Sequence, residues 1–362
     1  MLSPESIVLE GVEVVLSNCN FFGSTFSILL DGIDLAICSF SKTKNWQFSI
    51  EKSITLPYSK YWKETLQTLH SKSAAEIKLI DKKYGLFIGD TINNFLVSEK
   101  VDFIASHGHT IFHQPENKYS LQIGDGEIIA KITKTTTIND FRSLDVSLHG
   151  QGAPLVPIGD LHLFSNYKYW VNLGGFSNIS IKNSGVITAF DICPVNTVLN
   201  HYSNIIGYDF DKDGLIAREG KIESKLLDEL NSIEYYSKFN PKSLGIEWVI
   251  NIIYNIIDKY NIQVSDILRT YSEHIAIQTQ NAIKNNASTI LITGGGVRNK
   301  FLIELITNRL ENHINIPDDI LIDFKEALIF GFLGVLRLRN ENNCLSSVTG
   351  ASKNHSSGKI YQ

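Results

Sequence analysis

The sequence predicts an α/β protein organised as two domains. Segments rich in β-branched and aromatic residues alternate with segments in which leucine and isoleucine recur at helical spacing. The chain has 362 residues, which exceeds the length of a typical single domain. Two apolar, strand-like segments end directly in glycine turns.

The first third of the chain predicts an N-terminal α/β layer. Residues 12–40 and 48–56 carry β-branched and aromatic clusters between polar turns, and we expect strands there. From residue 58 to about residue 94 the apolar residues fall near helical spacing, which predicts helix. The segment VDFIASHG, residues 101–108, predicts a buried strand with a polar end.

The character of the sequence changes near residue 135, where TTTIND leads into the glycine- and proline-containing segment HGQGAPLVP. We expect a domain crossover here, with a first domain of residues 1–135 completed by residues 327–362, and a second of residues 136–326. In the second domain, YWVNLGGFSNISI, GVITAFDI and NASTILIT predict strands, and residues 221–287 predict mostly helix. A closing helix is expected over residues 324–338. The sequence shows no internal repeat of fixed period.

Composition narrows the class of partner. The net charge is −5 and no stretch is dense in lysine and arginine, which argues against binding of nucleic acid through its phosphates. A small-molecule partner fits better. The start of the chain is acidic and lacks a long apolar segment, and no run approaches the roughly 18 to 20 apolar residues that span a bilayer. We therefore expect a cytoplasmic protein without a membrane partner.

The four cysteines, Cys19, Cys38, Cys193 and Cys344, are widely spaced and form no CxxC or Cys/His pattern. This spacing supports neither a disulfide framework nor a zinc site. We expect them to be buried thiols in a reducing compartment.

The stretch FSILLDGIDLAI, residues 26–37, predicts a turn that leads into a buried strand. Asp31, Gly32 and Asp34 place two carboxylates at this turn, where a cation or phosphate could bind. The apolar run from Leu35 to Ile37 then predicts the strand. The bulky residues before Asp31 do not suit a phosphate-binding turn, which favours small residues and accessible backbone N–H groups.

Two further glycine turns directly follow apolar segments, Gly174-Gly175 in NLGGFSN and Gly294-Gly295-Gly296 in ITGGGVRN. Glycine lets backbone N–H groups approach an anion because no Cβ atom blocks the approach. The alternative is that each is a tight turn with no ligand. Together with the Asp-Gly-x-Asp turn, the two interpretations have similar weight.

The segment NDFRSLDVSLHGQGAP holds Asp140, Arg142 and Asp145 within six residues. On an extended segment, Asp140 and Arg142 point the same way and could line one wall of a cleft. Asp140 is then a candidate general base beside a guanidinium. The alternative is a structural ion pair at a domain junction.

The stretch SHGHTIFHQP places His107, His109 and His113 within seven residues. Their spacing could supply metal ligands, although no neighbouring Asp, Glu or Cys completes a set. Substrate contact or core packing is the favoured alternative. A G-x-S-x-G nucleophile elbow and a G-x-x-x-x-G-K-[ST] phosphate loop are both absent from the sequence.

Taken together, several segments resemble the anhydro-N-acetylmuramic acid kinase family, within the sugar kinase, Hsp70 and actin superfamily. They occur in the family's order between about residue 100 and residue 351. The matching segments are SHGHT, LQIGDGEIIA, NDFRSLDVSLHGQGAPLVP, NLGGFSNIS, FDICPVN, YDFDKDGLIAREGK, PKSLGIEW, ITGGGVRN and VTGA. The combination is specific, whereas no single segment is. It implies a two-domain actin-like ATPase fold with an interdomain cleft.

The resemblance also implies a function, an ATP-dependent kinase of 1,6-anhydro-N-acetylmuramic acid that acts in cell-wall recycling. Asp140 matches the family's catalytic base. This carboxylate deprotonates a water that attacks the anomeric carbon, while the freed O6 takes the γ-phosphoryl group of ATP. The expected partner is this sugar, and a homodimer is expected on family grounds.

The resemblance implies two groups of binding residues. Those expected to contact ATP are Asp31, Gly32, Asp34, Gly174, Gly175, Asn178, Gly294, Gly295 and Gly296. Those expected to contact the sugar are His107, His109, Arg142, Asp191 and Glu326. Among the carboxylates, Asp31, Asp34 and Asp191 are expected to orient Mg²⁺ through water. For Glu326 the alternative is an acidic residue that favours a helix N-terminus.

Three positions depart from the family pattern. His109 replaces a glutamine, residues 191–196 read DICPVN where the family has DTGPGN, and Thr25–Leu29 stand where the family has M-S-G-T-S. The last departure motivates a second hypothesis, a catalytically impaired relative that binds sugar or nucleotide as a sensor or partner module. A third interpretation is that residues 1 to about 29 are not the natural N-terminus.

Overall fold

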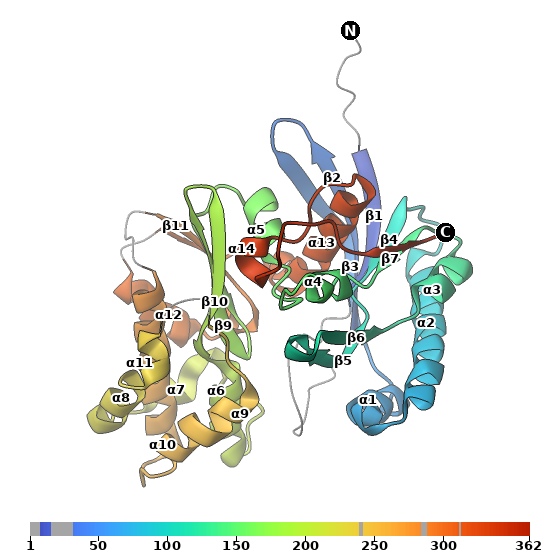
Figure 1. Ribbon diagram of the computed structural model, residues 1–362. Coiled ribbons are helices and arrows are strands. Elements are labelled where there is room, and N and C mark those ends of the chain that lie inside the picture. The colour runs from blue at the N-terminus through green and yellow to red at the C-terminus, as the bar shows by residue number, and fades with distance from the viewer. Residues whose placement is uncertain (1–7, 16–31, 239–241, 284–287, 311–312) are drawn as a thin grey trace. The chain divides into compact units, whose positions relative to one another are not determined.

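The computed structural model describes residues 8–15, 32–238, 242–283, 288–310 and 313–362 (Figure 1). The chain forms two compact units, one of residues up to Phe164 together with Phe324–Gln362, and one of Ser165–Asp323. We expected the crossover near residue 135. The chain leaves the first unit later because the strand at residues 137–139 is hydrogen-bonded within that unit's sheet.

The first unit is built on a six-stranded sheet of order β13-β7-β4-β1-β2-β3. β2 pairs antiparallel with both β1 and β3, β4 pairs in parallel with β1 and β7, and β13 pairs antiparallel with β7. The strands are β1 (Val8–Val15), β2 (Gly32–Lys42), β3 (Trp46–Pro57), β4 (Phe103–Ser106), β7 (Thr137–Asn139) and β13 (Lys359–Tyr361). The strand predicted after Asp34 already begins at Gly32.

Helices flank this sheet. They are α1 (Lys60–Thr68), α2 (Ala74–Leu96), α3 (Gly126–Thr133), α4 (Ser143–Ser147), α5 (Pro157–Leu163), α13 (Asp319–Leu338) and α14 (Ser346–Thr349), with short helices η1 (Leu69–Ser71) and η2 (Pro115–Asn117). A hairpin of β5 (His109–Gln114) and β6 (Tyr119–Ile123) leaves the main sheet.

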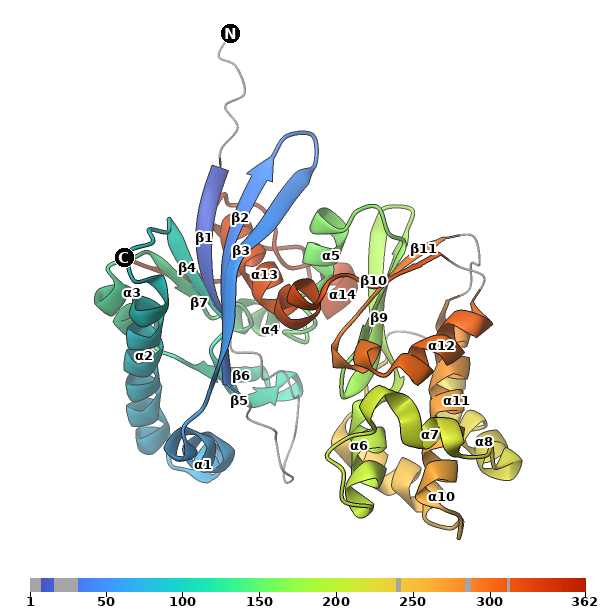
Figure 2. The ribbon, with the colours of Figure 1, turned by 180° about the vertical axis from the view of Figure 1, so that it is seen from behind.

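Strand β2 is buried on both faces, which explains its nearly continuous apolar run. Ile33 and Leu35 belong to a buried cluster that includes Tyr84 of α2. Phe40 instead packs against Phe332 of α13, with ring centroids 5.7 Å apart. Figure 2 shows α13 beside the sheet, so helices cover both of its faces.

The second unit is built on a five-stranded sheet of order β10-β9-β8-β11-β12. Its strands are β8 (Tyr169–Leu173), β9 (Phe176–Asn183), β10 (Val186–Pro194), β11 (Thr289–Thr293) and β12 (His313–Asn315). β9 pairs antiparallel with both β8 and β10, while β11 pairs in parallel with β8 and β12. This is the order and direction of β1, β2, β3, β4 and β7, so the topology repeats where the sequence shows no repeat.

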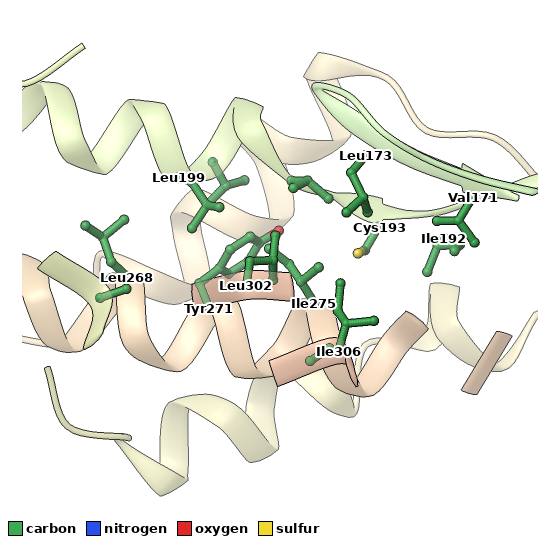
Figure 3. Packing of buried hydrophobic residues seen from close by; sticks show 14 of the residues in the cluster. Val171, Leu173, Ile192, Cys193, Leu199, Leu268, Tyr271, Ile275, Leu302 and Ile306 are labelled. Carbon is green, nitrogen blue, oxygen red and sulfur yellow. The ribbon is translucent and has the colours of Figure 1, made fainter. Parts of the chain in front are cut away.

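A helical layer packs on this second sheet around a large buried apolar cluster that contains Leu173, Tyr271 and Leu302 (Figure 3). Its helices are α6 (Asn196–Ile205), α7 (Leu215–Glu219), α8 (Ser224–Asn231), α9 (Ile246–Trp248), α10 (Asn255–Ile257), α11 (Val264–Ala282) and α12 (Lys300–Arg309). Short irregular helices are η3 (Lys212–Gly214), η4 (Glu234–Ser237), η5 (Val249–Tyr254) and η6 (Gly295–Arg298).

The closing helix α13 starts earlier than residue 324, the start that we expected. It begins at Asp319 because the Asp318 carboxylate accepts a hydrogen bond from the Leu321 N–H at 2.9 Å, which satisfies one of the amides of the first turn. Glu326 therefore lies well inside the helix, and the alternative that it stabilises a helix N-terminus is wrong.

The described cysteines, Cys38, Cys193 and Cys344, are buried as predicted, and Cys19 lies outside the described residues. Among the helices that the structure describes, none is long and apolar enough to cross a bilayer.

Candidate active site

Asp140 lies directly after β7, in a backbone conformation that non-glycine residues seldom adopt. Its φ is +55°, in the left-handed region. Its Oδ1 accepts a hydrogen bond from the N–H of Ser143, the first residue of α4, at 3.2 Å. A strained residue that the surrounding structure holds in place is characteristic of functional positions.

Lys359 is the charged partner of Asp140 in this structure. Its Nζ lies 2.8 Å from Asp140 Oδ2, and this hydrogen bond raises the pKa of the lysine. The contact follows from strand pairing, because Lys359 on β13 is aligned with Asn139 on β7. The sequence carries no signal for this pair, since the two residues meet only when the last strand of the chain joins the sheet.

A cavity of about 280 Å³, open to solvent, lies over Asp140 and is lined by more acidic than basic side chains. Asp81 on α2 accepts a hydrogen bond from Gly124 N–H at 2.7 Å, and burial raises the pKa of this carboxyl. Asp125 caps α3 by accepting from the N–H groups of residues 127 and 128. The polar and charged lining residues are Asp81, Ser120, Gln122, Asp125, Glu127, Asn139, Asp140, Ser143, Lys359 and Tyr361. Carboxylates and amides of this kind can bind the hydroxyl groups of a sugar.

Arg142 does not share a wall with Asp140 in the way we expected. The prediction assumed an extended segment, but the chain turns at Asp140 and Arg142 has helical dihedral angles at the start of α4. The Arg142 side chain is buried, and its Nη1 donates to Gly152 O at 2.7 Å. Its Nε donates to His107 Nε2 at 3.1 Å. Arg142 therefore braces the turn that carries Asp140.

The three clustered histidines do not form a metal site among the described residues. His107 Nε2 accepts from the Arg142 guanidinium, and a second cation at this atom would be repelled. Burial lowers the pKa of both His109 and His113 to about 4, so both are neutral near pH 7. The described group of side chains that could share a metal ion lies elsewhere.

The first predicted phosphate turn is described only from Gly32 onward, and Asp31 and Thr25–Leu29 lie outside the described residues. A Cβ atom at Gly32 would lie 2.2 Å from Leu56 O, so close strand pairing requires glycine here. Asp34 is buried, and its Oδ1 accepts from Thr55 Oγ1 on the neighbouring strand at 2.6 Å. The strand pair thus fixes the Asp34 carboxylate.

In the second unit, the two predicted glycine turns lie close together. β8 and β11 are adjacent and parallel, so Gly174-Gly175 and Gly294–Gly296 both follow the carboxyl ends of neighbouring strands. Gly294 has a φ of +87°, and a Cβ atom there would lie 2.8 Å from Leu173 O. This is the edge at which open α/β sheets bind ligands.

A row of polar residues crosses the same part of this sheet. Asn172 on β8 is paired with Asn178 on β9, which is paired in turn with Asp191 on β10. Directly paired residues present their side chains on one face. Asp191 Oδ2 accepts from Leu244 N–H at 2.8 Å, and burial raises the pKa of this carboxyl to about 6. Asn178 is exposed, and Glu326 of the first unit is half-buried on α13.

Comparison with known proteins identifies the family. The family model for anhydro-N-acetylmuramic acid kinase matches residues 21–362. The chain belongs to the anhydro-N-acetylmuramic acid kinase family. The matched range includes residues 25–29, where the sequence departs from the pattern of that family.

Curated anhydro-N-acetylmuramic acid kinases match along nearly their whole length. The protein of Sulfurovum sp. is 31% identical over 94% of this chain and 98% of its own. The protein of Francisella tularensis subsp. novicida is 33% identical over 91% of this chain and 95% of its own. The chain is thus a member of an ATP-binding kinase family.

Solved structures give weaker similarities. An ADPNP-bound activator of 2-hydroxyisocaproyl-CoA dehydratase from Clostridium difficile aligns with a TM-score of 0.41 and 13% identity, over 92% of this chain and 97% of that chain. A ROK family glucokinase from Streptomyces griseus aligns with a TM-score of 0.38 and 9% identity, over 90% of this chain and 98% of that chain.

Proposed function

We propose that the protein phosphorylates 1,6-anhydro-N-acetylmuramic acid with ATP while opening its anhydro ring with water, and releases N-acetylmuramic acid 6-phosphate and ADP. The observation that carries the proposal is the match to the kinase family over residues 21–362. The position of Asp140 at an acidic cavity supports the same chemistry.

In this reaction Asp140 acts as the general base. Its carboxylate takes a proton from a water molecule, and the water oxygen bonds to the anomeric carbon of the sugar. The bond between that carbon and O6 breaks, and O6 accepts the γ-phosphoryl group as ADP leaves. Lys359, whose Nζ lies 2.8 Å from Asp140 Oδ2, holds the carboxylate in position before the sugar binds.

The protein residues expected to contact the sugar fall into two groups, one nearly fully buried and one more accessible. Arg142, His107 and His109 are nearly fully buried, which favours a supporting role beneath the cavity over direct contact with the sugar. Glu326 and Asp191 are more accessible, and we propose that they contact the sugar.

The nucleotide is assigned to glycine turns and carboxylates. Gly174, Gly175 and Gly294–Gly296 offer close backbone approach to phosphates at one sheet edge, with Asn178 beside them. A Mg²⁺ ion would neutralise phosphate charge, and Asp34 and Asp191 are the described carboxylates that we propose to orient it through water. Asp31 and Gly32 belong to the same proposal.

A coupled assay of ADP release tests the function. We expect release to depend on the anhydro sugar and to fall by at least about 100-fold in Asp140→Asn, the loss typical of a missing general base. Asp90→Asn removes an exposed carboxylate from α2 and serves as the matched control. Normal turnover of Asp140→Asn, or ADP release that is independent of the sugar, would contradict the proposal.

The oligomeric state is a separate part of the proposal. A homodimer is proposed on the basis of the family resemblance. Sedimentation at two protein concentrations tests it, and a single monomeric species at both would contradict it.

A further inference from the structure

Three metal-ligating side chains meet next to the turn that carries Asp140, and the proposed reaction uses none of them. Asp145 on α4, Cys344 and His355 are 0%, 2% and 6% exposed. One ligand atom from each lies within 4.8 Å of the other two. Burying a carboxylate, a thiol and an imidazole costs free energy unless each has a polar partner, so their burial together points to an interaction that stabilises them.

The backbone presents Cys344 and His355 as a pair. The Cys344 N–H donates to His355 O at 3.0 Å, and the His355 N–H donates to Cys344 O at 3.2 Å. Residues that exchange both hydrogen bonds in an antiparallel bridge present their side chains on the same side. The bridge therefore directs the thiol and the imidazole to one place.

Asp145 is held in position from two sides. Gly152 N–H donates to its Oδ2 at 2.7 Å, and Thr349 Oγ1 donates to its Oδ1 at 2.7 Å. A Cβ atom at Gly150 would overlap this carboxylate, so the surrounding loop is shaped around it. The anion is thus preorganised before any ligand arrives.

The imidazole of His355 has one nitrogen satisfied and one not. Its Nδ1 donates to Lys353 O at 3.1 Å, which leaves the lone pair of the neutral ring on Nε2. Nε2 is buried without a hydrogen-bond partner and lies 3.4 Å from Asp145 Oδ1. A backbone carbonyl that fixes the other ring nitrogen in this way is the usual support of a metal-bound histidine.

We propose that Asp145, Cys344 and His355 bind a Zn²⁺ ion. A carboxylate oxygen, an imidazole nitrogen and a thiolate sulfur are the ligand types that zinc takes in proteins. The thiol releases its proton to solvent as the metal–sulfur bond forms. The hydroxyl of Ser357 lies close to the thiol and is buried without a hydrogen-bond partner, so it is a candidate for the fourth position.

The ion would act as a structural brace. It ties α4, which follows Asp140, to the segment between Cys344 and His355, and Lys359 lies four residues beyond that segment. Both members of the Asp140–Lys359 pair would thus be anchored near the same metal. The sequence conceals this site, because ten residues separate Cys344 from His355 and Asp145 is far from both.

Metal content tests the proposal directly. The full chain, without a histidine tag, is refolded with Zn²⁺ or Co²⁺, and bound metal is measured after gel filtration. We expect one ion per chain and, with cobalt, a thiolate-to-cobalt charge-transfer band in the near ultraviolet. Cys344→Ser and His355→Gln should each lose the band, while Cys193→Ala, which removes a buried thiol of the other unit, should keep it.

Thermal melting of the wild-type chain gives a second measurement that does not depend on the variants folding. A zinc chelator should lower the Tm of the wild-type chain, because a ligand that binds only the native state stabilises it. Failure of the wild-type chain to bind either metal would overturn the proposal. Metal retained by both ligand variants would overturn it too.

Discussion

Replacing Lys359 with methionine tests how the structure holds its proposed base. The substitution keeps most of the apolar length of the side chain and removes only the charge that lies 2.8 Å from Asp140 Oδ2. Strand β13 and its pairing with β7 need only backbone atoms, so the fold should survive.

The geometry limits how large the effect can be. The side chain of Lys359 is 64% exposed and that of Asp140 is 19% exposed, so water screens the pair. Ion pairs of this kind contribute about 0.2 to 1 kcal/mol. If the whole free energy of this ion pair serves to hold Asp140 in its reactive position, its loss lowers kcat/KM by at most about fivefold.

The assay is kcat/KM for ADP release across the pH range, with Lys359→Arg as the charge-retaining variant and Lys83→Met as a control for loss of an exposed lysine. A group that stabilises transferring charge directly would cost about 100- to 1,000-fold when removed. A loss of that size would refute the positioning role. An unchanged kcat/KM in both Lys359 variants would refute a positioning role for the ion pair.

Three further predictions concern stability. Burial raises the pKa of Asp191 from 3.8 to about 6, so folding favours its protonated form. The free energy of unfolding that this group contributes is fully present below pH 3.8 and is lost, by at most about 3 kcal/mol, as the pH rises through 6. Chemical denaturation should show a flatter dependence in Asp191→Asn, and an unchanged slope would contradict this. Gly294→Ala should lose about 1 to 3 kcal/mol because of its positive φ, whereas Gly295→Ala, with no atom nearer than 4.0 Å to the new Cβ, should melt like the wild type. Equal melting of the two variants would count against the argument. Arg142→Met should lose about 2 to 4 kcal/mol, because it leaves His107 Nε2 and a buried carbonyl without a donor; a denaturation midpoint near the wild-type value would show that water replaces the guanidinium.

Local sequence features suggested part of the candidate site. Asp140 was proposed from its segment, and the two glycine turns were proposed from the apolar strands before them, which the structure shows to be neighbours. These features are local, because a strand followed by glycine is visible within about ten residues. The direction of the Arg142 side chain was not predictable, since it depends on the left-handed conformation of one residue, Asp140.

Other contacts of the candidate sites depend on pairing between segments that are far apart in the sequence, so they could not be predicted from it. Lys359 reaches Asp140 only through the pairing of β13 with β7, and His355 reaches Asp145 only through the fold of the C-terminal segment. The repeated sheet topology is hidden for a related reason. Strand order depends on which segments are apolar and how they are connected, so two halves can share it without sharing residues.

The first unit is assembled from both ends of the chain, whereas the second is continuous. During synthesis, the ribosome therefore releases every residue of the second unit before α13 and β13 exist as folded elements. One face and one edge of the first sheet must wait for the final residues, and exposed apolar strands are prone to aggregate. Chains truncated after Asp323 should accordingly be substrates for chaperones and proteases, and Asp140 gains its cationic partner only after Lys359 has been synthesised.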